Sequence, residues 1–574
     1  MSSFKAYGKV DEYQQAMFEV RRKSRKRIII ISLSTIVLIG IVFAAVFGTV
    51  ARTNGHNNNN NDNNAQSLSS SVKAVCDVTL YPDSCYSSLN PLVKSGRIRP
   101  EDLSKLSIQV ALNEVSKGVR YFSEKGGFNE LNLNVDKRTK EALMNCKDLL
   151  GLAVDHLNDS LAYGGKSSLL DALEDLETWL SASGTYQQTC IDGIEEADKA
   201  LKSSITNNLK DSTQLTSNSL AIITWLNKAT TSVNFRRLLS SSNQNEEPKW
   251  LDPKVRKLLK KSDNIKPDIV VAKDGSGKYS TISDALEHVP NKSDKRTVIY
   301  VKKGTYLENV RVEKTKWNVM IIGDGMNVTI VSGSLNFVDG TPTFSSATFA
   351  VFGKNFIARD IGFKNTAGPE KHQAVALMTS ADQAVFYRCS MDAYQDTLYA
   401  HSNRQFYREC KIYGTVDFIF GNSAVVLQNC NILPRVPMQG QQNTITAQGK
   451  SDPNMNTGIS IQNCNVSPFG DLSSVQTYLG RPWKNYSTTV FMKCNLDGFV
   501  NPNGWLPWVG NSAPDTIFYA EFENVGNGAS TKNRVNWKGL KKITSKQAKK
   551  FTVQAFLSGD KWIPSSAVPF KSSL

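Results

Sequence analysis

A short pattern centred on cysteine recurs through the second half of this 574-residue chain. Residues 386–391 read FYRCSM, and the pattern returns at 427–432, 461–466 and 491–496, with a related copy at 407–412. Successive copies begin about 20–34 residues apart. Repeats of this period, each interpreted as one alternating strand, indicate a stacked solenoid. Few helical patterns separate the strands, which excludes a βαβ fold and favours a parallel β-helix with its cysteines on one inward ladder.

Two aspartates in this region have unusual neighbours. Asp396 lies in AYQDTLY (393–399), and Asp417 lies in YGTVDFIFGN (413–422), between residues that favour a buried strand. A buried carboxylate needs a cation or hydrogen-bond donors to stay ionised. Two such acids close together suggest a pair with divided roles, one charged and one protonated. The alternative is that both are ordinary turn or ladder aspartates.

Five stretches, in family order, resemble the motifs of plant pectin methylesterases. They are GTPTF (340–344), HQAVAL (372–377), AYQDTLY (393–399), YGTVDFIFGN (413–422) and LGRPW (479–483). The resemblance covers residues 268–565. It implies an all-β right-handed parallel β-helix and a carboxylic ester hydrolase, a pectinesterase, which releases methanol and pectate from methyl-esterified homogalacturonan in the plant cell wall.

The first half of the chain has a helical pattern. Apolar residues follow the three-four spacing of one buried helix face in 101–125, 139–161, 169–180 and 220–226. This pattern predicts an all-α antiparallel four-helix bundle. Residues 73–230 also resemble the pectin methylesterase inhibitor domain, which implies that the helical half is an autoinhibitory pro-domain.

The nine cysteines divide into four in the helical half and five in the repeats. The chain contains no Cys-x-x-Cys pair, so nothing supports a zinc or redox site. A luminal compartment permits disulfides, although four cysteines alone allow three pairings. The resemblance to the two families implies the pairs Cys76–Cys85, Cys146–Cys190 and Cys430–Cys464.

The N-terminus predicts a membrane anchor. Residues 1–27 end in the basic run RRKSRKR (21–27), and the run 28–50 contains no charge. As a helix, 28–50 would be roughly 35 Å long, enough to cross a bilayer, with the basic tail in the cytoplasm. A cleavable signal peptide is the alternative, although its apolar region is usually shorter. Residues 51–72 are rich in Asn and Ser and are interpreted as a linker.

A second linker is predicted at 231–267, with basic-dileucine stretches at Arg236-Arg237-Leu238-Leu239 and at 256–259. Exposed basic sites in flexible chain are good protease substrates. In the resembling family, such motifs mark where the inhibitor-like region is removed. We therefore expect a protease of the secretory pathway to cut here, most readily at the first stretch. A charged linker without processing is the alternative.

Hydrolysis of a methyl ester needs a nucleophile, an oxyanion hole and a proton donor for the departing methanol. The resemblance implies Asp417 as nucleophile, with Arg481 holding it charged. Asp396 would donate a proton to the leaving group and later take one from water. Gln395 and Gln373 offer amide donors where the oxyanion develops.

Substrate contacts are expected from matched family positions. They are Thr343, Gln373, Arg481 and Trp483. Tyr399 and Phe420 are further candidates for stacking on sugar rings, with plain solenoid core as the alternative interpretation. No cofactor or metal is predicted, since His372 and His401 near the motifs do not form a metal-spaced pair.

Charge and sequons bear on partners and location. The chain has 68 Lys and Arg against 52 Asp and Glu, which suits a polyanionic partner. No zinc-finger or RNA-binding signature occurs, so nucleic acid is not expected. N-glycosylation sequons lie at Asn158, Asn291, Asn327, Asn465 and Asn485. We expect a membrane-anchored precursor in the secretory pathway, and a monomeric mature enzyme in the extracellular cell wall that separate inhibitor proteins could bind.

Two other classes of function compete with the esterase. A polysaccharide lyase or glycosidase could use a β-helix, but the glutamine pair favours an acyl oxyanion over the paired acids that flank a glycosidic bond. A binding or inhibitor protein with an inactive catalytic half is the third class. Intact Asp396, Asp417 and Arg481 favour the enzyme. No Gly-x-Ser-x-Gly elbow occurs, which disfavours a serine esterase.

Overall fold

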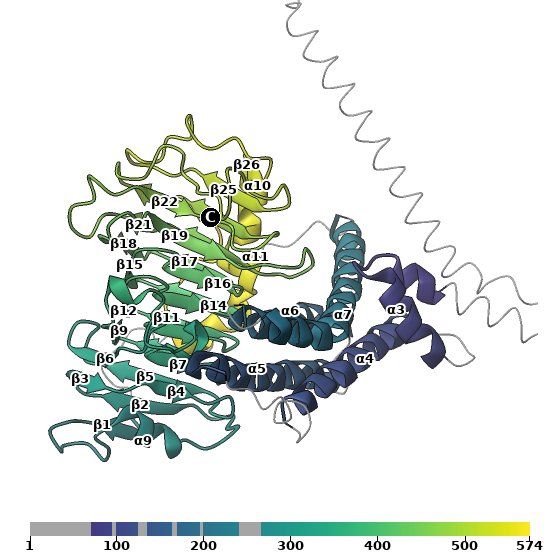
Figure 1. Ribbon diagram of the computed structural model, residues 1–574, viewed down its shortest axis with the longest axis horizontal. Coiled ribbons are helices and arrows are strands. Elements are labelled where there is room, and N and C mark those ends of the chain that lie inside the picture. The colour runs from purple at the N-terminus through teal and green to yellow at the C-terminus, as the bar shows by residue number, and fades with distance from the viewer. Residues whose placement is uncertain (1–70, 94–98, 124–134, 164–168, 196–198, 240–265) are drawn as a thin grey trace, which may run out of the picture. The chain divides into compact units, whose positions relative to one another are not determined.

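The computed structural model describes residues 71–93, 99–123, 135–163, 169–195, 199–239 and 266–574 (Figure 1). Val75–Leu92 and Arg99–Leu574 belong to one compact unit. The predicted anchor at 28–50 and nearly all of the linker at 51–72 lie outside the described residues. Within the described part of the chain, no helix is long and apolar enough to span a bilayer.

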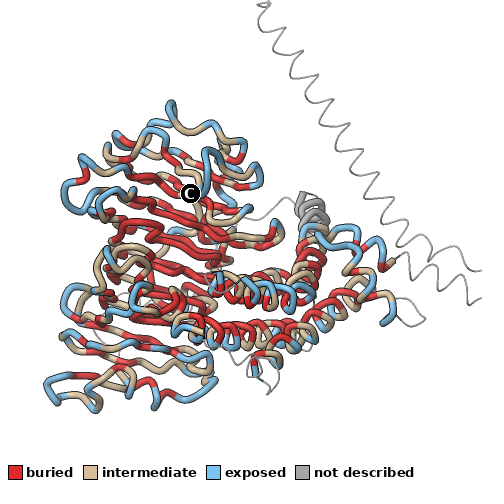
Figure 2. The backbone as a smooth tube through the Cα atoms, viewed as in Figure 1, coloured by how far each residue is buried: buried red, intermediate tan, exposed pale blue. Residues whose placement is uncertain are grey.

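Four long helices form the bundle, the described part of the helical half. They are α4 (Pro100–Tyr121), α5 (Lys137–Ala162), α6 (Leu169–Gly193) and α7 (Lys199–Leu239), preceded by the short helices α3 (Pro82–Leu89) and η2 (Asn90–Leu92). The Asp136 side chain caps α5 by accepting a hydrogen bond from the Thr139 amide. The apolar stripes pack inward, and the bundle helices carry many buried residues (Figure 2). Ile108, Leu150 and Leu180 are almost completely buried.

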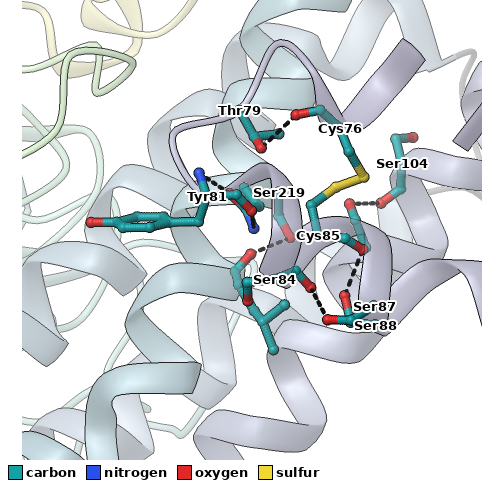
Figure 3. Close-up of a disulfide and its surroundings, with 12 residues drawn as sticks. Cys76, Thr79, Tyr81, Ser84, Cys85, Ser87, Ser88, Ser104 and Ser219 are labelled. Carbon is teal, nitrogen blue, oxygen red and sulfur yellow. Dashed lines mark hydrogen bonds between the residues drawn. A yellow bond between two sulfur atoms is a disulfide. The ribbon is translucent and has the colours of Figure 1, made fainter. Parts of the chain in front are cut away.

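Two disulfides link segments of the bundle, as the pairing predicted. Cys76–Cys85 holds the segment before α3 against that helix (Figure 3). Cys146–Cys190 joins α5 to α6 across 44 residues.

The second half is a parallel β-helix of three sheets, in which every ladder pair between strands is parallel. The first sheet contains β1 (Ile269–Val271), β2 (Thr297–Val301), β5 (Val319–Gly323), β8 (Ile357–Arg359), β11 (Ala384–Tyr387), β14 (Arg404–Arg408), β17 (Ala424–Gln428), β20 (Gly458–Gln462), β23 (Thr488–Met492), β25 (Phe518–Phe522) and β26 (Leu540–Lys541). The cleft sheet contains β4 (Val310–Val312), β7 (Phe349–Val351), β10 (Leu377–Thr379), β13 (Leu398–Ala400), β16 (Ile419–Gly421), β19 (Asn443–Gln448) and β22 (Thr477–Gly480).

The third sheet contains β3 (Gly304–Leu307), β6 (Thr329–Gly333), β9 (Gly362–Asn365), β12 (Ser390–Asp392), β15 (Lys411–Gly414), β18 (Asn431–Pro434), β21 (Asn465–Val466) and β24 (Asn495–Leu496). Short helices complete the fold: α9 (Ile282–Glu287), η5 (Thr343–Ser345), η6 (Pro369–Lys371), α10 (Ser545–Ala548), η7 (Lys549–Phe551), α11 (Val553–Leu557), η8 (Gly559–Lys561) and η9 (Ile563–Ser566). Val553, Leu557 and Trp562 cover the outer face of the first sheet.

The recurring hexapeptide is a corner between two strands, where the sequence predicted one alternating strand. The residue before each cysteine adopts a left-handed backbone, for example at Arg388 (φ 51°) and Asn429 (φ 56°). This conformation ends the strand of the first sheet and turns the chain into the third sheet. Asparagine tolerates it better than most residues, which explains the repeated Asn-Cys pairs. The solenoid itself is as predicted.

The five cysteines of the repeats lie in the buried core as predicted, but the expected Cys430–Cys464 disulfide is wrong. Both are free thiols. The Cys464 thiol points at the Leu427 carbonyl (3.4 Å), and the Cys430 thiol points at the Tyr407 carbonyl (3.6 Å). Cys410 and Cys494 make the same contact with the preceding coil. Cys389 instead bonds to the Tyr387 carbonyl of its own coil, so all five thiols are small core side chains bonded to backbone oxygens.

Candidate active site

The two singled-out aspartates lie on neighbouring coils. Asp396 directly precedes the Thr397 that leads into β13, and Asp417 directly precedes the Phe418 that leads into β16. Both have left-handed backbones, with φ of 64° and 51°. Such a conformation is uncommon outside glycine and is often found at functional sites. Because β13 and β16 are paired in parallel, both acids reach the same end of the cleft sheet.

The Asp417 carboxylate is held by one cation and one hydroxyl. Arg481 donates from Nη2 to Oδ2 at 2.7 Å and from Nε to Oδ1 at 2.8 Å. Thr444 donates its hydroxyl to Oδ1 at 2.6 Å. Burial lowers the pKa of Arg481, but hydrogen bonding and charge from Asp417 outweigh this effect, so its pKa is raised overall. This fork geometry gives the buried Asp417 side chain short, charge-assisted hydrogen bonds.

Asp396 has the opposite environment. Burial raises its pKa well above the ordinary value, the negative charge of Asp417 raises it further, and Arg481 opposes the shift. Its side chain forms no salt bridge with a cation among the described residues. The structure therefore places a carboxyl that favours its protonated form beside a carboxylate paired with arginine, which is the division that the sequence suggested.

Both predicted amide donors line the same cavity of about 430 Å³ as the two acids. The Gln373 side-chain oxygen is buried and has no hydrogen-bond partner among the described residues. The backbone fixes both residues in place: the Gln373 carbonyl accepts from the Phe337 amide, and the Gln395 carbonyl accepts from the Ala374 amide. These backbone hydrogen bonds hold the main chain of both glutamines at the wall of the cavity.

The predicted substrate contacts Thr343 and Trp483 also line this cavity. Tyr399 and Phe420 stack with ring centroids 4.1 Å apart and lie on the outer face of the cleft sheet. They pack in the cluster that contains the bundle side chains rather than in the solenoid core. The interpretation of Tyr399 and Phe420 as solenoid core is therefore wrong, and stacking on sugar rings stays a prediction.

One residue of the cavity was missed from the sequence. Trp508 lies with its ring 4.4 Å from the Arg481 guanidinium and 6.4 Å from the Trp483 ring. It belongs to a loop outside the repeats and the matched motifs. The sequence shows only a tryptophan near Gly504 and Pro507, a pattern that occurs in any surface loop. In the structure this tryptophan is partly exposed.

Helices α5 and α6 supply the opposite wall of the cavity. Ser345 beside the cleft donates to the Asn145 side chain at 2.9 Å, and Lys484 pairs with Asp192 at 2.7 Å. His401 shares a hydrogen bond of 2.8 Å with Thr189. The bundle therefore lies against the cleft sheet and forms one wall of the cavity that holds Asp396 and Asp417.

The predicted processing stretches and glycosylation sequons lie outside the five sequence motifs whose residues line the cavity. The processing stretch Arg236-Arg237-Leu238-Leu239 ends helix α7, where the sequence had predicted linker; the second stretch, 256–259, lies outside the described residues. Four sequon asparagines are exposed, whereas Asn465 is half-buried with its amide bonded to Asn495 and Ser467. In the described part of the chain, no three His, Cys, Asp or Glu side chains converge as a metal site would require.

Comparisons with known proteins agree with this architecture. The family model described as Pectinesterase matches residues 268–560, and the model described as Plant invertase/pectin methylesterase inhibitor matches residues 70–222. The Arabidopsis thaliana protein named "Probable pectinesterase/pectinesterase inhibitor 46" is 56% identical over 573 residues, with 99% of each chain covered. Pectinesterase 3 of Phaseolus vulgaris is 49% identical over 593 residues, with 100% of each chain covered.

A solved structure, titled pectin methylesterase from carrot, is similar to the catalytic half. It is 52% identical, with a TM-score of 0.54, and the match covers 55% of this chain and all of the carrot chain. The repeats, the paired acids and the full-length relatives lead to one assignment: the chain belongs to the pectinesterase family of carboxylic ester hydrolases and carries an inhibitor-like helical domain before its catalytic β-helix.

Proposed function

We propose that this chain hydrolyses the methyl esters of polygalacturonate in the plant cell wall, releasing methanol and pectate. The observation that carries the proposal is the pair of acids in one cavity: Asp417 held by Arg481, and Asp396 with a raised pKa. The family membership and the pectinesterase names of full-length relatives support the substrate class.

In the proposed mechanism, an Asp417 oxygen attacks the ester carbonyl carbon and forms a tetrahedral oxyanion. Gln373 and Gln395 donate amide hydrogens to that oxygen, and losing one such donor typically costs about 2.7–4 kcal/mol of barrier. Asp396 gives its proton to the departing methoxide, so methanol leaves and an acyl-enzyme anhydride remains. Water then attacks the anhydride and gives a proton to Asp396, which restores both acids.

Sugar binding is assigned to the aromatic and polar walls of the cavity. Trp483 and the stacked pair Tyr399 and Phe420 offer flat apolar faces, and Thr343 offers a hydroxyl. Arg481 would orient the nucleophile and contact the sugar acid at the same time. Trp508, beside Arg481, extends this wall.

We further propose that the bundle keeps the precursor inactive. Its α5 and α6 side chains close the cavity that a polymeric substrate would have to enter. A tethered domain acts at an effective concentration of order millimolar, so even weak affinity holds the site covered. Cleavage at Arg236-Arg237-Leu238-Leu239 by a secretory-pathway protease would remove the tether and its high effective concentration. It would release a monomeric enzyme into the wall.

We propose that the uncharged run 28–50 anchors the precursor in the membrane, with the basic residues 21–27 on the cytoplasmic side. Extraction of membranes with alkaline carbonate tests this: an anchored precursor stays in the pellet, and a precursor that is released into the supernatant contradicts the anchor.

The esterase is tested by methanol release from highly methylated pectin, using protein cut at an engineered protease site within 240–248. We expect release by the cut protein and a loss of at least about a thousandfold in Asp417→Asn, because an amide cannot attack the ester. Asp515→Asn, at an exposed loop position, is the matched control and should keep full activity. Activity of Asp417→Asn near that of the control, with both variants folded, would overturn the assignment.

A further inference from the structure

Ion pairs between the bundle and the β-helix share one polarity. Among the described residues, five such pairs join the two: Arg311–Asp148, Lys314–Asp155, Arg404–Asp175, Lys484–Asp192 and Lys561–Glu174. In each of these five, the acid belongs to the bundle and the base to the β-helix. Most members are at least partly exposed, and exposed pairs of this kind add little to stability. The shared polarity of these pairs is therefore not explained by a gain in the stability of the contact between the bundle and the β-helix.

The bases at the N-terminal end of the interface gather around aromatic rings. Lys354 lies over the Trp317 ring at 3.7 Å, with Lys292 on the same ring at 6.0 Å. The Arg311 guanidinium lies over the Phe352 ring at 4.0 Å. Cations beside flat apolar faces suit a ligand that presents both carboxylates and ring surfaces. A polymer of uronic acids has that chemistry.

A second cavity, of about 620 Å³, lies beside the Lys314–Asp155 ion pair, between the β-helix and the bundle. Lys292, Lys314, Lys354 and Trp317 line one side, and Asp155 and Asp159 of α5 line the other. Acids of the β-helix near these bases are paired with arginines: Glu313 with Arg311 at 2.9 Å, and Asp382, which also lines the cavity, with Arg404 at 2.6 Å. The cavity is distinct from the one that holds Asp396 and Asp417.

The position of these bases relates them to the active site. Arg311 lies on β4, and the cleft sheet runs from β4 through β7 and β10 to β13, next to Asp396. Three steps between paired strands place β4 about 14 Å from β13. A polymer lying along this face could therefore reach both the catalytic acids and the bases.

We propose that Arg311, Lys314, Lys292 and Lys354, with Trp317, form a second binding surface for polyuronate carboxylates, which the acids of α5 occupy in the precursor. This inference rests on the proposed function. The ligand is the de-esterified polymer, the product of the reaction, because its free carboxylates match the bases. Removal of the bundle exposes the surface and lets the enzyme stay on the chain it has already processed.

The test is binding of fully de-esterified polygalacturonate to the β-helix after cutting within 240–248 and separation from the bundle. Arg311→Glu with Lys314→Glu should weaken binding at least tenfold and reduce its dependence on salt. Lys546→Glu with Lys549→Glu is the matched control, with the same charge change at exposed positions near the C-terminus, and should weaken binding less than twofold. The uncut precursor should bind like the Arg311 and Lys314 variant.

Equal binding by the two double variants would overturn the surface, because net charge alone would then explain the attraction. If the glutamate variant fails to fold, Arg311→Gln with Lys314→Gln replaces it, with Lys546→Gln and Lys549→Gln as its control. If the proposed function itself is wrong, the unmodified cut protein will release no methanol, which is a different outcome from equal binding by the two double variants.

Discussion

At the residue scale, His401 shows how one side chain serves the contact between bundle and β-helix. Its Nε2 faces the Thr189 hydroxyl of α6 at 2.8 Å, and its Nδ1 faces the Ser380 hydroxyl at 2.7 Å. The ring also contacts Tyr186 and Tyr399. Asp192 lines the same small cavity as His401 and is paired with Lys484. Burial lowers the pKa of His401 to about 3.

This burial makes the stability of the uncut precursor depend on pH. The folded pKa of about 3 lies below the ordinary value of 6.5, so the unfolded chain binds the proton more readily. The stabilising contribution is complete above pH 6.5 and is lost as the pH falls from 6.5 toward 3. At pH 5 the loss amounts to about 2 kcal/mol. Thermal unfolding of the precursor at pH 7.5 and pH 5 measures it.

His401→Gln removes the titrating group and keeps hydrogen-bonding capacity toward Thr189 and Ser380. We expect its stability to fall less between pH 7.5 and pH 5 than that of the unmodified precursor. His372→Gln, at a half-buried position beside the cleft, is the control and should keep the original slope. Identical slopes for the two variants would contradict the role of His401.

At the element scale, the disulfide Cys146–Cys190 joins the two helices that face the cleft. Both α5 and α6 carry side chains that line the cavity and acids that pair with the β-helix. A bond across 44 residues restricts the unfolded chain more than Cys76–Cys85, whose sequence separation is 9. The chain-entropy model gives about 4 kcal/mol for the longer loop and about 2.6 kcal/mol for the shorter one.

We expect Cys146→Ala with Cys190→Ala to loosen the bundle and raise the methanol-release activity of the uncut precursor. Cys76→Ala with Cys85→Ala should have a smaller effect, since that bond closes a shorter loop beside α3. The catalytic half should tolerate reductant, because its five cysteines are free thiols. An uncut precursor that stays equally inactive in both variants would count against the importance of the longer link.

At the scale of the whole molecule, the catalytic β-helix and the bundle packed against it are parts of one chain. The bundle meets the β-helix through apolar contacts around Tyr399 and Phe420 and through ion pairs of one polarity. Helix α7 continues as far as Leu239, so the first processing stretch lies at the end of a helix. A protease needs extended chain, and cutting there requires the last turn of α7 to open.

The uncut chain should therefore be nearly inactive on methylated pectin. We expect Arg236→Ser with Arg237→Ser, combined with Ser replacements of the basic pair at 256–257, to yield a precursor that releases little methanol. An engineered protease site within 240–248 should restore activity when cut. Full activity of the uncut precursor would refute autoinhibition without affecting the esterase assignment.

Much of the architecture was readable from local sequence. The period of the cysteine-centred repeats predicted the solenoid, and the three-four spacing predicted the helices, because both patterns are encoded within windows of a few turns or strands. The unusual neighbours of Asp396 and Asp417 singled out both acids for the same reason. What the local pattern could not reveal was that each hexapeptide bends at a left-handed residue, since φ depends on the coil above and below.

The remaining features depend on contacts between distant parts of the chain. Thr189 meets His401 across 212 residues, and Lys314 meets Asp155 across 159. The thiols of Cys430 and Cys464 stay free because each finds a backbone oxygen of the preceding coil. Local sequence determined the two folds and the two acids. Only the tertiary structure decided that the bundle packs beside those acids, and which bases of the β-helix face the bundle. Burial and charge pairing arise where the two folds pack against each other.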